Sequence, residues 1–269
     1  MISAREIFEK YYRKTTKRLG QNFLFDEKIN AKIVSAAGDL SGKKIAEVGP
    51  GPGGLTLEIL KQDIEELCVI ELDSHWASIW KELAPKFGGK LRVLQIDALD
   101  YDLKKLSADV VISNLPYNIS TQLLYRWLFH FDACEKYVLM FQKEVAERIY
   151  AFHGTKSYGR LSVLCQIRAA ITKCFDLEPG SFTPPPKIKS TVVKFIPFSN
   201  ERTLDDQKFK KLDQFLSKVF SCRRKTIIKS MKEFFNDPIM VLEDLGYNEK
   251  VRAEEISVQD YKKLCEKYF

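Results

Sequence analysis

The stretch KIAEVGPGPGGLTLEIL, residues 44–60, decides the fold of this chain. It opens with the strand-like residues 44–48, of which Ile45, Ala46 and Val48 are apolar, and the residues from 54 to 61 have helical spacing. Between them, Gly49, Gly51 and Gly54 match the pattern G-x-G-x-x-G, whose glycines allow a tight turn and a close approach of backbone to ligand. The stretch predicts a strand, a glycine loop and a helix that bind a nucleotide-like ligand.

Acidic residues end the next two predicted strands. Glu71, followed by Leu72, comes twenty residues after Gly51, where a carboxylate can accept hydrogen bonds from both hydroxyls of a ribose. Asp97-Ala98 follows the apolar run 91–96, where an acid can accept a hydrogen bond from an adenine amine. The glycine loop alone fits a nicotinamide cofactor and S-adenosylmethionine equally well, and the second acid favours S-adenosylmethionine.

The tetrapeptide Asn114-Leu115-Pro116-Tyr117 follows another apolar run, residues 108–113. The amide oxygen of Asn114 and the carbonyl of Leu115 can accept hydrogen bonds from an exocyclic amine. Pro116 stiffens the turn, and Tyr117 can stack on the face of a flat base. Taken alone, the tetrapeptide is equally an ordinary turn after a strand. Placed after a glycine loop and two acids, it predicts a site for adenine.

The predicted strands and helices alternate along the chain. Strands are expected near 44–48, 67–71, 91–96, 108–113 and 136–141, and helices near 27–38, 54–61, 74–84, 119–131 and 143–151. This alternation predicts a mostly parallel, doubly wound sheet. A helix over 161–168 and two strands over 170–177 and 190–197 are expected to complete it. We therefore predict a first domain over residues 1–198, with a basic N-terminal arm, and a small helical domain over 199–269.

Composition narrows the class of protein. The six cysteines are scattered without a C-x-x-C pair, which argues for a reducing compartment and against a zinc site or disulfide framework. No apolar run approaches the roughly 18 residues of a membrane helix. We expect a cytoplasmic protein without a metal.

The net charge of +7 is unevenly distributed. Residues 1–20 carry six Lys and Arg against two acids, and residues 140–199 carry nine against four. Residues 21–139 are mildly acidic, with 13 against 17. The mildly acidic segment 21–139, which holds the predicted cofactor residues, suits a cationic cofactor. The basic segments suit a polyanionic substrate.

The order of these sites resembles the Rossmann-like methyltransferases that act on amino groups of bases. Three further motifs resemble the ribosomal RNA adenine N6,N6-dimethyltransferase family: LGQNFL at 19–24, GRLSV at 159–163 and SFTPPPK at 181–187. FSCRRKT at 220–226 and RAEEIS at 252–257 resemble its small-subunit branch, and the similarity runs from about residue 16 to the end. The resemblance implies an α/β class I methyltransferase sheet with a small C-terminal all-α domain, S-adenosylmethionine as cofactor, and small-subunit ribosomal RNA in a 30S-type precursor as partner.

The resemblance also assigns roles to residues. The target adenine is held by Asn114 to Tyr117, with Phe182 stacking opposite Tyr117; the prolines after Phe182 are expected to keep it from continuing a helix or strand. The expected cofactor residues are Gln21, Asn22, Leu24, Gly49, Gly51, Glu71, Leu72, Asp97, Ala98 and Asn114. The expected RNA contacts are Arg148, Arg160, Lys187, Arg223, Arg224 and Lys225, the last three preceding a predicted helix over 226–235.

Two alternatives remain open. One is a relative that modifies large-subunit RNA and confers antibiotic resistance, against which the motifs at 181–187 and 220–226 argue. The other is a catalytically silent RNA-binding assembly factor, against which the intact acids and Asn114-Tyr117 motif argue. We expect a monomeric enzyme that dimethylates N6 of two adjacent adenines.

Overall fold

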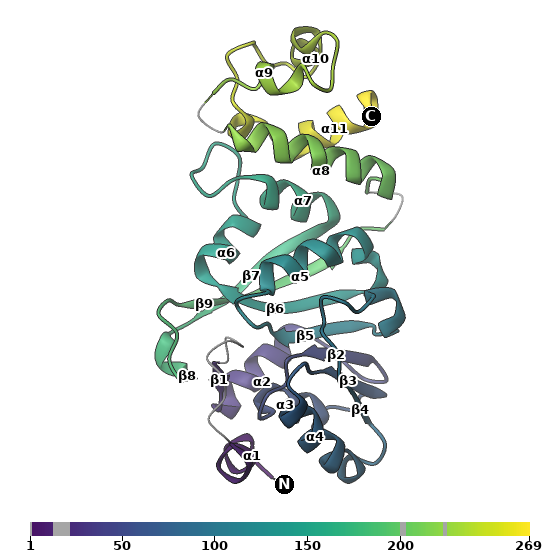
Figure 1. The fold of residues 1–269 in the computed structure, drawn as a ribbon, viewed down its shortest axis with the longest axis vertical. Helices are drawn as coiled ribbons and strands as arrows, with labels where there is room; N and C mark the ends of the chain where they lie inside the picture. Colours follow the sequence, from purple (N-terminus) through teal and green to yellow (C-terminus); the bar gives the residue numbers. More distant parts are fainter. Residues whose placement is uncertain (1, 13–21, 200–202, 223–224) are drawn as a thin grey trace. The chain divides into compact units, whose positions relative to one another are not determined.

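The computed structural model describes residues 2–12, 22–199, 203–222 and 225–269 (Figure 1). The chain forms two compact units, Met1–Ala146 with Thr172–Pro197, and Glu147–Ile171 with Phe198–Phe269. The second unit thus includes residues 147–171 in addition to the C-terminal region.

Seven strands form the main sheet in the order β4-β3-β2-β5-β6-β9-β7. Strands β2 to β6 pair in parallel, and β9 runs antiparallel to β6. The chain builds one side of the sheet from β2 to β4 and then crosses to β5, so the strand order reverses between β2 and β5, where open α/β sheets bind ligands. The bounds are β2 Lys44–Val48, β3 Glu66–Ile70, β4 Leu91–Leu94, β5 Val110–Asn114, β6 Lys136–Gln142, β7 Ala169–Leu177 and β9 Ser190–Pro197.

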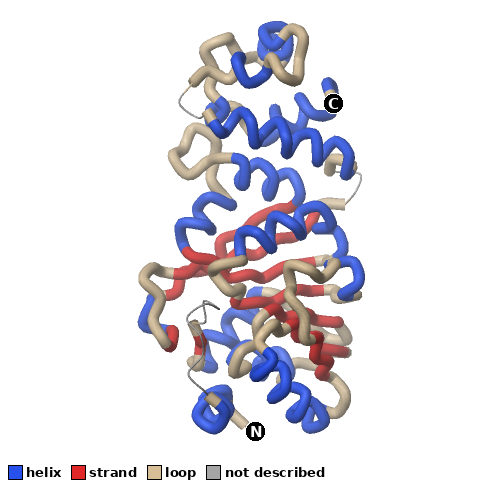
Figure 2. The backbone as a smooth tube through the Cα atoms, in the orientation of Figure 1, coloured by secondary structure: helices blue, strands red, loops and turns tan. Residues whose placement is uncertain are grey.

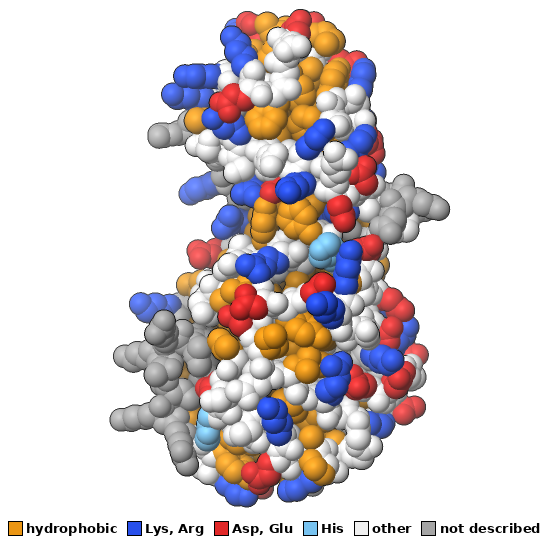
Figure 3. Space-filling view, turned by 45° about the vertical axis from the view of Figure 1, so that its right-hand side comes forward, with side chains coloured by type: hydrophobic (Ala, Val, Ile, Leu, Met, Phe, Trp, Pro, Cys, Tyr) orange, Lys and Arg blue, Asp and Glu red, His pale blue; other side chains and the backbone are white. Residues whose placement is uncertain are grey.

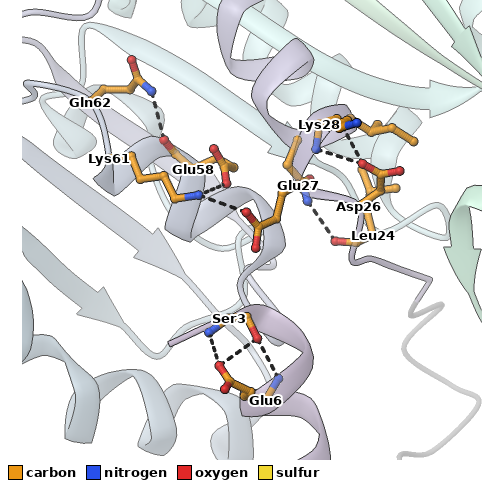
Figure 4. A network of polar contacts seen from close by, with 11 residues as sticks. Ser3, Glu6, Leu24, Asp26, Glu27, Lys28, Glu58, Lys61 and Gln62 are labelled. Atoms are coloured by element: carbon orange, nitrogen blue, oxygen red, sulfur yellow. Dashed lines mark hydrogen bonds and ion pairs between the residues drawn. The ribbon is translucent and has the colours of Figure 1, made fainter. Parts of the chain in front are cut away.

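Helices cover both faces of this sheet because its central strands are buried on both faces. In Figures 1 and 2, α2, α3 and α4 lie on one side of the strands and α5 on the other. Asp26 caps α2 by accepting from the amides of Lys28 and Ile29, and Lys61 joins Glu58 to Glu27 (Figure 4). The helices are α1 Ala4–Tyr11, α2 Glu27–Ala36, α3 Gly54–Leu60, α4 Ser74–Leu83, α5 Ser120–Trp127 and α6 Lys143–Ile149.

The second unit is mainly helical. One face of α8 is apolar and buried, and Phe215 on it meets the rings of Phe234, Phe235, Tyr261 and Phe269. These contacts give the unit an aromatic core of its own. Its helices are α7 Arg160–Arg168, α8 Asp206–Ser221, α9 Ile228–Met231, α10 Pro238–Asp244 and α11 Val258–Tyr268.

The structure confirms the predicted fold class and differs in local detail. The helix predicted over 226–235 is wrong in extent, because α9 covers only Ile228–Met231. Thr226 instead forms a β-bridge with Arg252, and the amide of Ile227 donates to the carbonyl of Val251 at 3.0 Å. The β-bridge holds Thr226 outside the helix, and Ile227 is the N-cap from which α9 begins.

The segment just before α2 contains a short strand that the sequence did not predict. Helix α1 precedes it, and Leu24 lies in β1 (Phe23–Leu24), which pairs with β8 (Phe182–Thr183). Phe182 thus belongs to a short strand, which ends at Thr183 before Pro184. Within the residues that the structure describes, no helix could cross a membrane.

Candidate functional site

One cleft in the first unit gathers most of the predicted site residues around the carboxyl ends of β2, β3 and β5. It encloses about 1030 Å³, including open solvent at its mouth. The predicted residues that line it are Asn22, Leu24, Gly49, Gly51, Glu71, Leu72, Asp97, Ala98, Asn114, Leu115, Pro116 and Tyr117.

The glycine loop after β2 shapes the floor of the cleft. Gly51 has a φ of +50°, and its carbonyl accepts a hydrogen bond from Trp80 Nε1 at 2.7 Å. A Cβ on Gly54 would lie only 2.1 Å from the carbonyl oxygen of Leu24. Glycine at these positions therefore permits a left-handed turn and lets β1 approach the start of α3.

Glu71 lies directly after β3 and is buried. One carboxylate oxygen accepts from the amide of Gly51 at 3.3 Å and the other from the amide of Asp73 at 2.9 Å. Burial raises the pKa of Glu71 to about 7, although both amide donors act to lower it. A cation bound nearby would favour the ionised form, and each carboxylate oxygen keeps a further lone pair for a ribose hydroxyl.

Glu47 is a cleft residue that sequence reasoning did not assign. It is buried at the end of β2, and Thr56 donates its hydroxyl proton to it at 2.7 Å. Burial, together with the nearby charge of Glu71, raises the pKa of Glu47 to about 8. An acid inside an otherwise apolar strand, directly before the glycine loop, is the sequence signal that could have identified it.

Asp97 follows β4, and its Oδ1 accepts from the amide of Leu99 at 2.8 Å. This short turn orients the carboxylate at the cleft and leaves the other oxygen for a ligand amine.

Asn114 is the last residue of β5. Its Nδ2 donates to the carbonyl of Asn22 at 3.3 Å, which joins the strand end to the segment before β1. Because the amide nitrogen serves as donor here, Oδ1 is the acceptor that the side chain presents.

The Tyr117 hydroxyl lies 2.5 Å from Ser190 Oγ at the start of β9. Burial raises the pKa of Tyr117, so the phenol stays neutral at physiological pH. The ring of this cleft residue is therefore anchored at its far end by a strand of the sheet.

Phe182 is not among the residues that line the cleft. Its backbone pairs with Leu24, and its side chain is 3% exposed within the core of the first unit. The stacking role expected for Phe182 stays a prediction, and with β8 in this position the ring is covered.

The predicted RNA contacts differ in their surroundings. Arg148, Lys187 and Lys225 are exposed. Arg160 instead forms an ion pair with Asp213 at 2.7 Å, so a neighbouring carboxylate already balances its charge. Gln21, Arg223 and Arg224 lie outside the described residues.

The strand order and the cleft at its switch point define a class I methyltransferase. The sequence profile of the family described as ribosomal RNA adenine dimethylase matches residues 12–268, and the chain belongs to this family. Family membership confirms the predicted enzyme class, an adenine dimethyltransferase of ribosomal RNA that uses S-adenosylmethionine.

Individual relatives are similar over nearly their whole length. The chain is 39% identical over 263 residues to ribosomal RNA small subunit methyltransferase A of Rhodospirillum rubrum, with 97% of this chain and 90% of that protein covered. It is 41% identical over 261 residues to the protein of the same name from Cereibacter sphaeroides, with 96% and 93% covered.

Solved structures of two methyltransferases are also similar to this chain. A dimethyladenosine transferase from Plasmodium falciparum superimposes with a TM-score of 0.78 at 31% identity, covering 90% of this chain and 95% of that one. The 23S rRNA methyltransferase ErmE shares the fold, with a TM-score of 0.68 at 21% identity and 92% and 99% coverage.

Proposed function

We propose that this chain transfers methyl groups from S-adenosylmethionine to the N6 atoms of two adjacent adenines in small-subunit ribosomal RNA. Relatives named for the small subunit, 39–41% identical over nearly the whole chain, support this substrate. The observation that carries the proposal is the single cleft that unites Glu71 and Asp97 with Asn114 to Tyr117. Cofactor and base sites thus share one cavity.

The residues present fit the cofactor. S-adenosylmethionine supplies a methyl group on a positively charged sulfur, which is already activated for transfer. Glu71 would accept from the ribose hydroxyls and Asp97 from the adenine amine. Glu47 adds a second buried carboxyl to the same cleft. Two carboxyls with raised pKa values suit a cationic ligand, since its charge would draw both toward the ionised form.

The target base is proposed to lie against the end of β5. Asn114 Oδ1 and the Leu115 carbonyl would accept hydrogen bonds from the two N6 hydrogens. Those bonds favour a tetrahedral nitrogen whose lone pair is directed at the incoming methyl group. Tyr117 would stack on the base, which is worth roughly 1–3 kcal/mol.

No side chain needs to act as a base. An amide such as that of Asn114 takes up no proton at neutral pH, and Tyr117 stays a neutral phenol. We infer that the N6 proton leaves to water after transfer.

The RNA surface is proposed to include Arg148, Lys187 and the cluster Arg223-Arg224-Lys225, with residues 199–269 acting as a helical RNA-contact domain. Arg160 is a weaker candidate because it pairs with Asp213. On the face drawn in Figure 3, Lys and Arg side chains are interspersed with acids. Binding would therefore depend on local clusters. We further infer a monomer that acts in the cytoplasm on a 30S-type precursor.

Radiolabelled methyl transfer to unmethylated small subunits, large subunits and protein-free RNA tests the proposal. We expect incorporation into small-subunit RNA as N6,N6-dimethyladenosine. Incorporation only into large subunits would favour the resistance-type enzyme. Calorimetry that detects no S-adenosylmethionine binding would favour the silent assembly factor.

A further inference from the structure

The loop between α6 and α7 can be followed in Figure 1. It holds the most exposed large apolar side chain of the described residues. Phe152 is 75% exposed, and residues 152–156 are all exposed. Ala151 and Tyr158 on either side of this loop tip are buried. The loop therefore exposes one phenyl ring to solvent, while the residues that flank the loop tip are buried.

Hydrogen bonds brace this loop. Gln166 Nε2 donates to the carbonyl of the residue before the ring at 2.9 Å, and the Gly154 amide donates to the carbonyl of Glu254 at 2.7 Å. The hydroxyl of Thr155 donates to the carbonyl of Phe152 itself at 2.6 Å. The braced backbone keeps the ring at one place on the surface, so little backbone entropy is lost when the ring binds a partner.

The charge around the ring favours a polyanion. Between residues 148 and 159 the sequence has two cations, Arg148 and Lys156, and no acid, whereas Arg160 is paired with Asp213. Arg148 and Lys156 are exposed. Single exposed apolar residues are common on proteins, but an exposed aromatic ring in a basic stretch of sequence is a combination that suits unpaired nucleic acid. Bases stack on the ring while phosphates pair with the cations.

We propose that Phe152 is a stacking platform for an unpaired base of the RNA substrate. The residue is not among those that line the cleft, so the platform is separate from the adenine site. The identity of the nucleic acid rests on the proposed function. Stacking tolerates any base, so the platform adds affinity without selecting a sequence.

Affinity for unmethylated small subunits across a salt series tests the platform. Phe152→Ala should weaken binding roughly five- to hundredfold at every salt concentration, with an unchanged slope of log affinity against log salt, because stacking releases no counterions. Phe152→Trp should keep the affinity, and its added emission should be quenched on binding. Ile196→Ala is the matched control, since Ile196 is a 46% exposed apolar residue outside the segments proposed to contact RNA.

Crosslinking identifies the partner. Benzoylphenylalanine at position 152 should attach to RNA, and an adduct formed only with ribosomal protein would overturn the proposal. A Phe152→Ala variant that binds small subunits with wild-type affinity would also overturn it. Methyl transfer by the wild-type enzyme to the same subunits tests the proposed function separately. If the wild type methylates them and Phe152→Ala binds them with wild-type affinity, only the platform is refuted.

Discussion

The Tyr117 hydroxyl and Ser190 Oγ lie 2.5 Å apart, although 73 residues separate them in sequence. Ser190 is fully buried and is held in register with Gln142 across β6 and β9. The Tyr117 ring, which is proposed to stack on the target base and follows β5, is thus tied to a different strand of the sheet. This contact makes Ser190 a positioning residue for the ring.

We expect Ser190→Ala and Tyr117→Phe each to lower kcat about three- to tenfold, because each removes the same hydrogen bond, worth roughly 0.5–1.5 kcal/mol. Their effects should not add in the double variant. A double-mutant cycle compares the wild type, the two single variants and the double variant. For each protein, single-turnover methyl transfer, cofactor affinity and melting temperature are measured. Additive losses would assign Ser190 a purely structural role.

Glu71→Ala should weaken S-adenosylmethionine binding ten- to a hundredfold, because a hydrogen bond to a charged group is worth roughly 1.5–3 kcal/mol. RNA affinity should change little. Calorimetry of Glu71→Ala against Asp63→Ala, which alters an exposed acid, measures the difference. Unchanged cofactor affinity in a folded variant would remove Glu71 from the site.

Glu47→Gln should raise stability at alkaline pH. Glu47 has a folded pKa of about 8 against an ordinary 4.5, so the folded state holds its proton more tightly than the unfolded chain does. The resulting stabilisation is complete below pH 4.5 and is lost as pH rises through 8. The neutral glutamine avoids that loss, on the order of a few kcal/mol.

Urea unfolding of cofactor-free protein at pH 5, 7 and 9 measures this effect. The variant should match the wild type at pH 5 and exceed it at pH 9, whereas Glu249→Gln, at an exposed position, should behave as wild type throughout. A pH-independent difference would mean that Glu47 does not titrate in this range.

Asn114→Ala should reduce transfer far more than it weakens binding of either partner, because its hydrogen bond matters most as the nitrogen rehybridises. With cofactor saturating, the wild-type chemical step should be nearly flat between about pH 6.5 and 8.5, since Tyr117 stays neutral and no side chain serves as base. A bell-shaped single-turnover profile would reveal a missing acid–base residue.

Neutralising Arg223, Arg224 and Lys225 together should weaken RNA binding and leave cofactor affinity unchanged. If each meets one phosphate, the slope of log affinity against log salt should become shallower by up to about 2–2.7 units. The loss should be similar across RNA sequences, because phosphate contacts carry little sequence information. A salt titration with an unaltered slope would move the RNA footprint toward Arg148 and Lys187.

Much of this protein follows from local sequence. The alternation of apolar runs and helical spacing predicts the parallel sheet, because each strand and helix is specified by its own few residues. Gly51, Glu71, Asp97 and Asn114 were predicted to serve one site from their order along the alternating strands and helices. The carboxyl ends of parallel strands meet at one edge of a sheet, which is why such residues come together. The cleft contains all four.

Only the tertiary structure decided what depends on distant partners. The raised pKa of Glu47 comes from burial, and the anchoring of Tyr117 comes from a serine on β9. Arg160 appeared to be a free cation in sequence until folding placed it beside Asp213. Phe182 was predicted to stack on the base, and only the fold shows that its ring is buried and that its backbone pairs with β1. Sequence spacing specifies which backbone forms a strand or helix, whereas burial and long-range pairing specify the state of each side chain, because both arise only when separate segments pack together.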